Sequence, residues 1–474
     1  MSRASLIRLL VFLGTAAFIV VGTVLVIRYA EGYRPTRSGF IKGTGLLAAN
    51  SFPSGAEVYI NSRLTTATDN TLNLDPGVYD IAIRKDGYHD WEKKLTVTSE
   101  LVTQTNAQLF PTSPTLEPLT FTGAVNPVPS PDGLHIAFTV ASASAAAKNG
   151  LYVVDLNSSP LIMNKSAHQI ARTSESYDYQ AATYTWSPNS SELLVAFKNG
   201  AHVLLPANSF TDLGSVKDVT ATLPQTWTEW ELELAREEQP HLAKLPDFMA
   251  KVATASATNL YFSPDGNRLL YQAVADFTIP ENLIPPLPAS STQIQARSVK
   301  TGGWYVYDLK EDRNFLITEG IAPTPAPSPA PTAKLQNGNT VPLPSPFTPQ
   351  KLMLVPDINL PLPAELGLSV VGSQSAFRTL QTGVTNAETI ELFNAQYSSM
   401  FVSSAQWYPD SAHIVLTTDR GIDVMEYDGT NRVTVYSGPF DPHFVYPWPD
   451  GSSLVTRIQF SPDTTPDLYT IKLK

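Results

Sequence analysis

The feature that most constrains this chain is a short turn that recurs five times between residues 129 and 451. Each copy has Pro before Asp or Asn, and an alternating apolar strand follows it. Pro fixes φ, the Ser and Asp side chains cap the turn, and Gly or Asn is expected in the left-handed position. A hairpin repeated at irregular spacing predicts a radial β architecture. The copies are PSPDG at 129–133, WSPNS at 186–190, FSPDG at 262–266, WYPDS at 407–411 and WPDG at 448–451.

A second strand often follows the strand after the turn, as expected of propeller blades. Without roughly 55 inserted residues, this region would form about seven blades at roughly 40–45 residues each, but only five turns are visible. We therefore expect residues 111–474 to form a β-propeller of about six blades, with five to seven open. The chain ends in the strand LYTIKLK, and a strand within 115–122 is expected to close the ring beside it. The second strands are expected at 151–156, 304–309, 422–429 and 467–473.

One insertion into the repeat, residues 226–250, is expected to be helical. Thr226 and Thr228 each have a glutamate three residues on, and either pair makes a capping box that predicts a helix start. Pro240 and Pro246 are expected to break the helix into pieces. This helical insertion either packs across the propeller rim or docks a partner.

A second insertion, residues 322–350, includes the run APTPAPSPAPT. Such a run favours polyproline II and cannot bury a core, so we expect an exposed loop or linker. Residues 351–400 carry only weak strand signals, which predict no firm placement.

The N-terminal region predicts a membrane anchor. Residues 9–27 are nineteen residues without a charge, and as a helix they would span roughly 28 Å, close to the hydrocarbon thickness of a bilayer. The run is longer than the apolar core of a signal peptide and lacks a small-residue cleavage site. We therefore expect a tail at 1–8, a transmembrane helix at 9–28 and a linker at 29–44. The numbers of arginines on the two sides of the helix nearly tie, so the positive-inside rule does not decide the orientation. The domains beyond the helix are expected outside the cytoplasm.

Residues 45–110 predict a small β-sandwich, because short alternating strands are separated by Pro-Gly and Asp-Gly turns. The motifs are PSGA at 53–56, VYI at 58–60, LDPGVY at 74–79 and IRKDGY at 83–88. These motifs resemble the PEGA domain. Ser54 departs from the Glu of that family, and the usual second turn is missing from residues 63–73. The resemblance implies an envelope-located spacer or binding module rather than a catalyst.

The five turns with their strands resemble the WD40-like repeat of TolB-type β-propellers. The motif is weak alone and specific when it occurs five times. The resemblance implies a rigid ring of blades whose loops converge on one face, which suits recognition. The fold class is thus all-β: a transmembrane helix, a PEGA-like sandwich, and a propeller of about six blades with a helical insertion.

Composition excludes several functions. The net charge is −11 and the pI is about 5.2, which argues against a nucleic-acid partner. The chain has no cysteine, so disulfides, thiolate nucleophiles and cysteine-bound metals are excluded.

The seven histidines show no metal-binding spacing, and the chain has no nucleophile elbow, phosphate loop or dinucleotide fingerprint. His135 and His413 fall at equivalent points after the turn, which indicates a structural role. Glutamates at 229–238 are typical of a solvated helix face, and their spacing matches no known Ca²⁺ loop. The turn aspartates are explained by capping; they are Asp132, Asp265, Asp410 and Asp450.

The sequence thus predicts a single-pass, membrane-anchored bacterial envelope protein without catalytic residues, cofactor or metal. Its PEGA-like stalk would present a propeller that binds a protein or a cell-wall polymer. One alternative is a propeller enzyme whose active site lies at the mouth of the channel. It would need a cluster of titratable side chains there. Another alternative is a structural scaffold of the cell surface.

Overall fold

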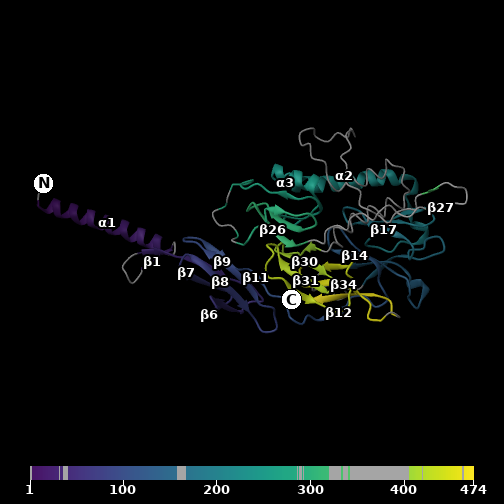
Figure 1. Cartoon of the computed structure of the whole chain (residues 1–474), viewed down its shortest axis with the longest axis horizontal. Coiled ribbons are helices and arrows are strands. Elements are labelled where there is room, and N and C mark those ends of the chain that lie inside the picture. Colours follow the sequence, from purple (N-terminus) through teal and green to yellow (C-terminus); the bar gives the residue numbers. More distant parts are fainter. Residues whose placement is uncertain are drawn as a thin grey trace. The chain divides into compact units, whose positions relative to one another are not determined.

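The computed structural model places the elements shown in Figure 1 and divides the chain into two compact units. The first unit holds Met1–Ser113, Leu287–Ile294 and Lys474, and the second holds Pro114–Pro286 and Gln295–Leu473. The structure describes residues 3–30, 33–35, 41–156, 167–285, 287, 291, 293–319, 333–334, 340–341, 405–418, 420–461 and 464–474.

The N-terminal segment forms helix α1 (Arg3–Ala30), and a short antiparallel pair follows, β1 (Tyr33–Pro35) with β2 (Ile41–Gly43). A helix is expected here because the run is apolar and free of Pro. Within the described residues, no helix combines the length and the apolar character that a membrane crossing requires.

The first unit contains a β-sandwich. One sheet has the order β6-β5-β8-β9 and the other β10-β3-β7, and a two-stranded pair, β11 with β4, extends the module. In β8 the side chains of Ile81 and Ile83 are buried while their neighbours are more exposed, as the alternating sequence predicts. Together with Val58 and Trp91 they pack into one core. The bounds are β3 (Gly45–Ala49), β4 (Ser51–Phe52), β5 (Glu57–Ile60), β6 (Arg63–Ala67), β7 (Asn70–Leu74), β8 (Gly77–Arg84), β9 (Trp91–Val97), β10 (Val102–Gln104) and β11 (Ala107–Gln108).

The second unit contains five four-stranded antiparallel sheets among its described residues, which we number as blades 1 to 5. Blade 1 is β13 (Val125–Pro129), β14 (His135–Val140), β15 (Gly150–Asp155) and β16 (His168–Arg172). Blade 2 is β17 (Thr183–Trp186), β18 (Glu192–Ala196), β19 (His202–Pro206) and β20 (Lys217–Asp218). Blade 3 is β21 (Ala257–Phe262), β22 (Arg268–Ala273), β25 (Trp304–Asp308) and β26 (Arg313–Thr318).

Blade 4 is β29 (Ala405–Trp407), β30 (His413–Thr418), β31 (Gly421–Glu426) and β32 (Val433–Tyr436). Blade 5 is β33 (Val445–Pro447), β34 (Ser453–Ile458), β35 (Asp467–Lys472) and β12 (Leu116–Pro118). Each predicted second strand is therefore the third strand of its blade. The predicted number of about six exceeds these five, and the Pro-rich segment 322–350 and residues 351–400 lie outside the described residues. Two short strands inside segment 322–350 are described, namely β27 (Ala333–Lys334) and β28 (Thr340–Val341).

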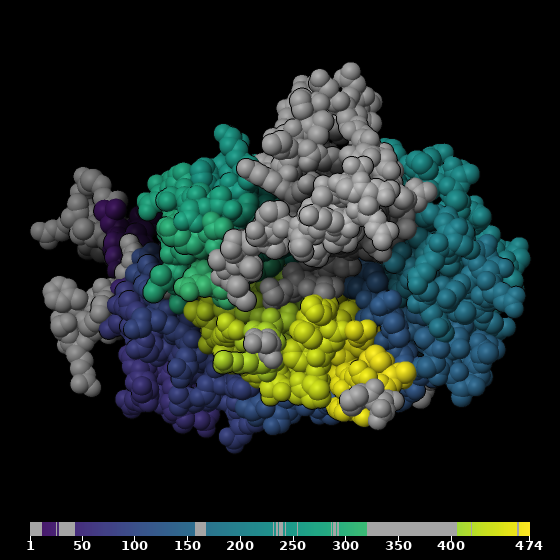
Figure 2. Space-filling view, turned by 45° about the vertical axis from the view of Figure 1, so that its right-hand side comes forward, coloured from purple at the N-terminus to yellow at the C-terminus, as the bar shows by residue number. Residues whose placement is uncertain are grey.

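The two ends of the second unit meet in blade 5. Strand β12 pairs antiparallel with β35, with Glu117 opposite Thr470, so the prediction of a closing strand within 115–122 is confirmed. The Thr120 hydroxyl donates to Asp467 Oδ1 at 2.7 Å, which ties the residues after β12 to the start of β35. In Figure 2 the yellow residues near the C-terminus lie against blue residues from the start of this unit.

Neighbouring blades share buried cores. One core joins blades 1 and 2 around Trp186, another joins blades 5 and 1 around Phe138 and Trp448, and a third joins blades 3 and 4. Between blades 4 and 5 the Gln406 side-chain amide donates to the Val445 carbonyl at 2.5 Å. The blades therefore follow one another around a ring, as a propeller requires.

The helical insertion lies between blades 2 and 3. Helix α2 (Leu223–Leu242) buries Trp227 and Trp230 against blade 2, while α3 (Asp247–Lys251) and the π-helical turn η4 (Val252–Ser256) pack on blade 3. Figure 1 shows both helices along one side of these blades. Three short 3₁₀ turns and one further pair complete the described elements: η1 (Ala146–Lys148), η2 (Leu213–Ser215), η3 (Thr220–Thr222), and β23 (Phe277–Thr278) with β24 (Ser298–Val299).

The predicted start of this helix was wrong. Thr226 and Thr228 are not caps, because both lie inside α2 and their hydroxyls donate to the Thr222 and Pro224 carbonyls four residues earlier. The helix begins at Leu223, and Pro224 sits in the first turn, where a missing N–H costs little. Pro240 does not break the helix either, since it lies inside the last turn of α2.

Candidate functional site

The turn aspartates bond to their own turns. Asp132 Oδ1 accepts the Ser130 hydroxyl at 2.5 Å and the Leu134 N–H at 2.9 Å. Asp265, Asp410 and Asp450 do the same: the Oδ1 of each accepts the backbone N–H of the residue two positions later. In blade 2 the side-chain oxygen of Asn189 accepts the equivalent N–H. These carboxylates therefore act as capping groups.

The residue after each Asp or Asn has positive φ and packs against the element that precedes its blade. Gly133 faces the Tyr446 hydroxyl of blade 5, and Gly451 faces the Tyr408 ring of blade 4. At the two turns with serine in this position, the contact is a hydrogen bond instead. Ser190 Oγ accepts the Asp132 N–H at 3.0 Å, and Ser411 Oγ accepts the Asp265 N–H at 3.0 Å. The expected Gly or Asn was thus wrong at two turns, where serine takes the left-handed position with φ near +60°.

The blade 3 turn differs, because the preceding element is a helix. A Cβ on Gly266 would lie 3.1 Å from the His241 ring of α2, and this ring packs 5.2 Å from Phe262. The end of α2 thus occupies the place that a preceding blade occupies at the other four turns. This favours the rim-packing role that the sequence left open for the insertion.

The predicted equivalence of His135 and His413 holds in space. Both begin the second strand of a blade, and Arg268 occupies the same point in blade 3. His135 Nδ1 lies 2.8 Å from Asp155 Oδ1, and His413 Nδ1 lies 2.6 Å from Asp410 Oδ2. Each basic side chain is thereby paired with a nearby carboxylate.

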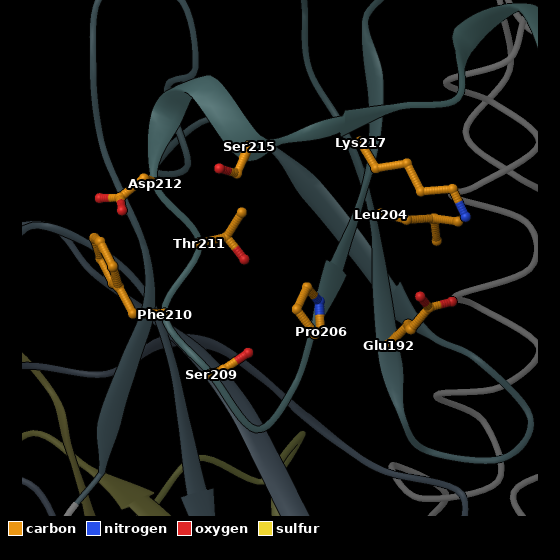
Figure 3. A pocket seen from close by; sticks show the side chains of 9 residues that line it. All are labelled: Glu192, Leu204, Pro206, Ser209, Phe210, Thr211, Asp212, Ser215 and Lys217. Carbon is orange, nitrogen blue, oxygen red and sulfur yellow. The ribbon is translucent and has the colours of Figure 1, made fainter.

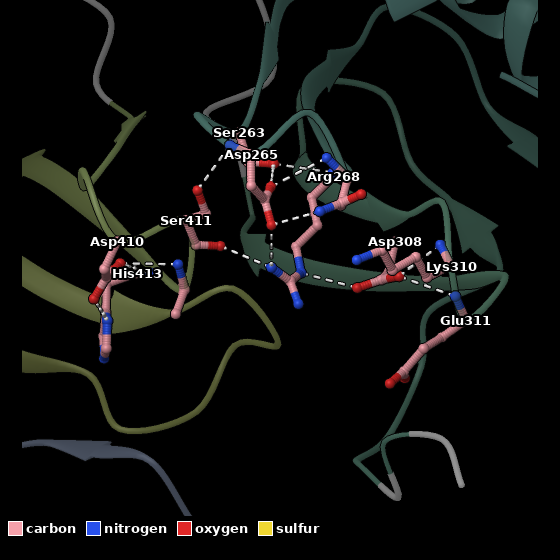
Figure 4. A network of polar contacts seen from close by, with 11 residues as sticks. Ser263, Asp265, Arg268, Asp308, Lys310, Glu311, Asp410, Ser411 and His413 are labelled. Carbon is pink, nitrogen blue, oxygen red and sulfur yellow. Dashed lines mark hydrogen bonds and ion pairs between the residues drawn. The ribbon is translucent and has the colours of Figure 1, made fainter. Parts of the chain in front are cut away.

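Arg268 forms the most extensive of these contacts, shown in Figure 4. Its Nε donates to Asp308 Oδ2 at 2.8 Å, its Nη1 donates to the Ser411 carbonyl at 2.9 Å, and its guanidinium stacks 3.8 Å from the Tyr427 ring centre. Asp308 is only 2% exposed. Burial acts to lower the pKa of Arg268, but Tyr427 and Asp308 outweigh it, so the pKa is raised. This network joins blades 3 and 4.

The pKa of Asp410 lies below its usual value. Burial acts to raise the pKa of Asp410, yet the hydrogen bond and charge of His413 and two backbone N–H groups lower it overall. Among the described side chains, no group of three or more His, Asp or Glu residues is placed to hold a metal ion.

A first cavity, of about 330 Å³, lies on blade 2 (Figure 3). Figure 3 shows Lys217 and Glu192 on one side of it, and Phe210 and Asp212 on the other. Hydroxyl groups of Ser209, Thr211 and Ser215 line the rest. The mixture of both charges favours no single ligand class.

A larger cavity, of about 710 Å³, is an open groove where the ring closes, and we call it the closure groove. Blade 5 supplies one wall through β12, the residues after it and β35. Blade 1 supplies the other through β14, η1, β15 and β16. Its lining residues are Glu117, Pro118, Leu119, Thr120, Phe121, Thr122, Phe138, Lys148, Tyr152, Ala167, Gln169, Thr470 and Lys472.

Aromatic rings and cations distinguish the closure groove. The Phe121 side chain is 78% exposed, and the Tyr152 ring stacks on Phe138 with centroids 5.8 Å apart. Lys472 pairs with Glu117 at 3.2 Å, and Lys148 is exposed. The sequence predicted no binding residue. This groove carries no local motif because its lining residues are scattered between 117 and 169 and are joined by Thr470 and Lys472 from the other end of the unit.

A comparison with known protein families supports the PEGA resemblance of the β-sandwich in the first unit. Residues 44–113 match the family model of the PEGA domain, so the predicted resemblance is confirmed. No curated protein matches the chain.

The solved structures that match include a putative TolB from Agrobacterium tumefaciens, with 12% identity, a TM-score of 0.19 and coverage of 75% of this chain and 73% of that one. They also include the β-propeller domain of Cps50 (Swd1) from Myceliophteria thermophila, with 10% identity, a TM-score of 0.24 and coverage of 75% and 97%. An oligogalacturonate lyase in complex with manganese matches with 10% identity, a TM-score of 0.19 and coverage of 91% of both chains. The strand order of the five blades and the cores between them define the propeller fold.

Proposed function

We propose that this protein is a membrane-anchored binding protein of the bacterial envelope, in which the propeller engages a protein or cell-wall partner through the closure groove. The observation that carries the proposal is the groove itself: an open cavity of about 710 Å³ that combines an exposed phenylalanine with cationic side chains. Cavities of this size, with apolar walls and a few polar groups, are typical of ligand sites.

A non-catalytic role is favoured by the use of the reactive side chains. The carboxylates of Asp132, Asp265 and Asp410 each accept backbone N–H groups of their turns, and His413 is bonded to Asp410. A general acid or base needs its functional atoms directed at a substrate. Groups already engaged in capping are poor candidates for such work.

The anchor is proposed from the sequence alone: residues 9–27, which lie within α1, carry no charge. Phe12, Phe18 and Ile19 are among its exposed apolar side chains, which a bilayer would cover. In this proposal the PEGA domain is the spacer between the anchor and the propeller, and both domains face outward.

Protease protection tests the anchor and its orientation. Intact cells with the outer layers opened are treated with protease, and a tag after Lys474 is followed beside a cytosolic control protein. Loss of the tag with survival of the control supports the outward orientation. Survival of both until lysis would overturn it, and recovery of the protein in the soluble fraction would overturn the anchor.

Position-specific cross-linking tests the groove. A photoreactive amino acid replaces Phe121 in the full chain, and Phe460, which is 60% exposed outside the groove, serves as the matched position. Adducts in intact cells at position 121 but not at 460 are expected. Equal yields at both positions, or none at 121, would contradict a binding role for the groove.

A further inference from the structure

We propose that the closure groove binds an anionic glycan. This inference rests on the proposed binding function of the same groove and adds the chemical class of the partner. The groove offers three features that together match a chain of acidic sugars: unbalanced positive charge, aromatic faces, and an edge that discourages a peptide strand.

The positive charge of the groove is local, since the chain as a whole carries −11. Lys472 is paired with Glu117 at 3.2 Å, so these two charges offset each other. The Lys148 ammonium has no ion-pair or hydrogen-bond partner in the part of the chain that the structure describes. The groove therefore keeps one uncompensated cation, which favours a partner with negative charge.

The aromatic rings provide apolar faces rather than hydroxyl groups. The Tyr152 hydroxyl donates to the Lys148 carbonyl at 2.7 Å, so its polar end is already occupied. Its ring stacks on Phe138, and Phe121 stands exposed on the opposite wall. A sugar ring has C–H groups on its faces and hydroxyl groups at its edge, so it can pack on such rings while its hydroxyls reach polar groups.

An acceptor for these hydroxyls is present in blade 1. The Gln169 amide nitrogen donates to the carbonyls of Ala147 and Asn149, both at 3.2 Å. These bonds fix the orientation of the side chain and leave its carbonyl oxygen as an acceptor. A glycan presents many hydroxyl donors, which suits this oxygen.

The edge of β12 argues against an added peptide strand. Leu119 donates to the Leu468 carbonyl, and the Thr115 carbonyl accepts the Lys472 N–H, so Leu116 and Pro118 face the outer edge by the alternation of an antiparallel pair. Pro118 has no N–H to donate, and the strand is only three residues long. Both features discourage strand addition at this edge.

Binding by the full-length chain in detergent tests the proposal with three probes of similar length. The probes are an alginate hexasaccharide, maltohexaose and hexaglutamate, which represent an acidic glycan, a neutral glycan and an acidic peptide. We expect alginate to bind more tightly than either other probe, with an affinity that weakens as salt is raised.

Two groove variants and two matched controls locate the binding. Phe121→Ala and Lys148→Gln are each expected to weaken alginate binding about tenfold or more, equivalent to roughly 1.4 kcal/mol. Phe460→Ala and Lys310→Gln remove the same side-chain types from exposed positions outside the groove and are expected to change nothing. Thermal unfolding of each variant checks that the fold is kept.

The outcomes separate this inference from the proposed function. If hexaglutamate binds best and depends on Phe121 and Lys148, the glycan is wrong but the groove still binds a partner. If alginate binding is unchanged in both groove variants, or no alginate binding is detected, the glycan proposal fails. Cross-linking at position 121 then decides separately whether the groove has another partner.

Discussion

At the scale of single residues, the same backbone position in the five turns is filled in two ways. Gly occupies it where an aromatic side chain of the preceding element lies within about 3 Å of the position of a Cβ, as at Gly133, Gly266 and Gly451. Ser190 and Ser411 occupy it where the preceding turn offers a backbone N–H. A left-handed serine costs roughly 1–2 kcal/mol, which the bond between blades helps to offset.

This trade-off predicts different effects for two substitutions of one residue. Ser190→Ala keeps the backbone cost and leaves the Asp132 N–H without its acceptor, so we expect a loss of about 1–2 kcal/mol in stability. Ser190→Gly loses the same bond but relieves the backbone, so it is expected to be nearly neutral. Denaturant unfolding followed by tryptophan fluorescence measures both, since every tryptophan except Trp91 lies in the second unit. Ser209→Ala, at an exposed position, is the control, and equal losses for Ala and Gly would contradict the account.

The pairing of Asp410 with His413 predicts part of the acid sensitivity. Because the folded-state pKa of Asp410 lies below its usual value of 3.8, the carboxylate stabilises the fold fully above that pH, and the stabilisation is lost as pH falls through the folded pKa. Asp410→Asn can still accept the turn N–H groups, as Asn189 does, but loses the charge.

We therefore expect Asp410→Asn to lower stability at pH 7 by about 1–2 kcal/mol and to flatten the decline below about pH 4. Unfolding measured at a series of pH values checks both effects. Asp212→Asn, at an exposed position, should leave the curve unchanged. An unaltered acid transition in Asp410→Asn would show that the pair does not contribute.

Much at this scale could be predicted from the sequence. The capping by Asp132 and its equivalents follows from local turn chemistry, which is visible within five residues. The serines in the left-handed position could not be predicted, because their stabilising partner, the N–H of Asp132 or Asp265, belongs to another blade. The cation of Lys148 gave no signal either, since its meaning depends on neighbours that are distant in sequence.

At the scale of elements, α2 links blades 2 and 3, because it packs on blade 2 and its His241 ring lies beside Gly266 and Phe262 of blade 3. Trp227 and Trp230 lie edge to face with ring centroids 5.7 Å apart, and both are buried against blade 2. Capping-box rules misplaced the start of this helix because Thr226 and Thr228 satisfy the pattern, while Pro224 in the first turn is the better indicator of the start.

Truncating either tryptophan tests this joint. We expect Trp227→Ala and Trp230→Ala each to cost about 3–5 kcal/mol, because a large buried side chain leaves a cavity. The double variant should cost less than the sum, since the rings touch. Additive losses would mean that the two rings act independently.

Thr228→Ala is the matched control in the same helix. If Thr228 capped the helix, its loss would cost about 1 kcal/mol. Because it lies inside α2, we expect no loss, and denaturant unfolding distinguishes the two.

At the scale of the whole molecule, the closing strand makes a ring from a linear chain. A fragment of residues 114–474 keeps β12 and is expected to unfold cooperatively, because the second unit carries its own cores. A fragment of residues 124–474 lacks β12 and the Leu119 contact with blade 1, and we expect it to lose at least about 3 kcal/mol or to aggregate through the edge of β35. Calorimetry and light scattering of the two fragments compare them, and equal stability would contradict a closing role.

The order of strands within this ring could be predicted from the repeated turn, and even the closing strand could be located. The closure groove could not, because Phe121, Tyr152 and Lys472 share no motif and meet only when the ring closes. Placement of α2 between two blades was likewise beyond the sequence, since its apolar face fits any apolar surface.

The closing strand also has a consequence for the order of events during synthesis. Glu117 and Thr470 are separated by 353 residues, so eleven of the thirteen lining residues leave the ribosome long before Thr470 and Lys472 complete the groove. At roughly 5–20 residues per second, the wait is about 20–70 s. During this interval blade 1 has no partner on one side, and a chain that stops early never acquires the groove. The closure groove therefore forms only after β35 has been synthesised, and under the proposed function only molecules that have reached this stage can bind the partner.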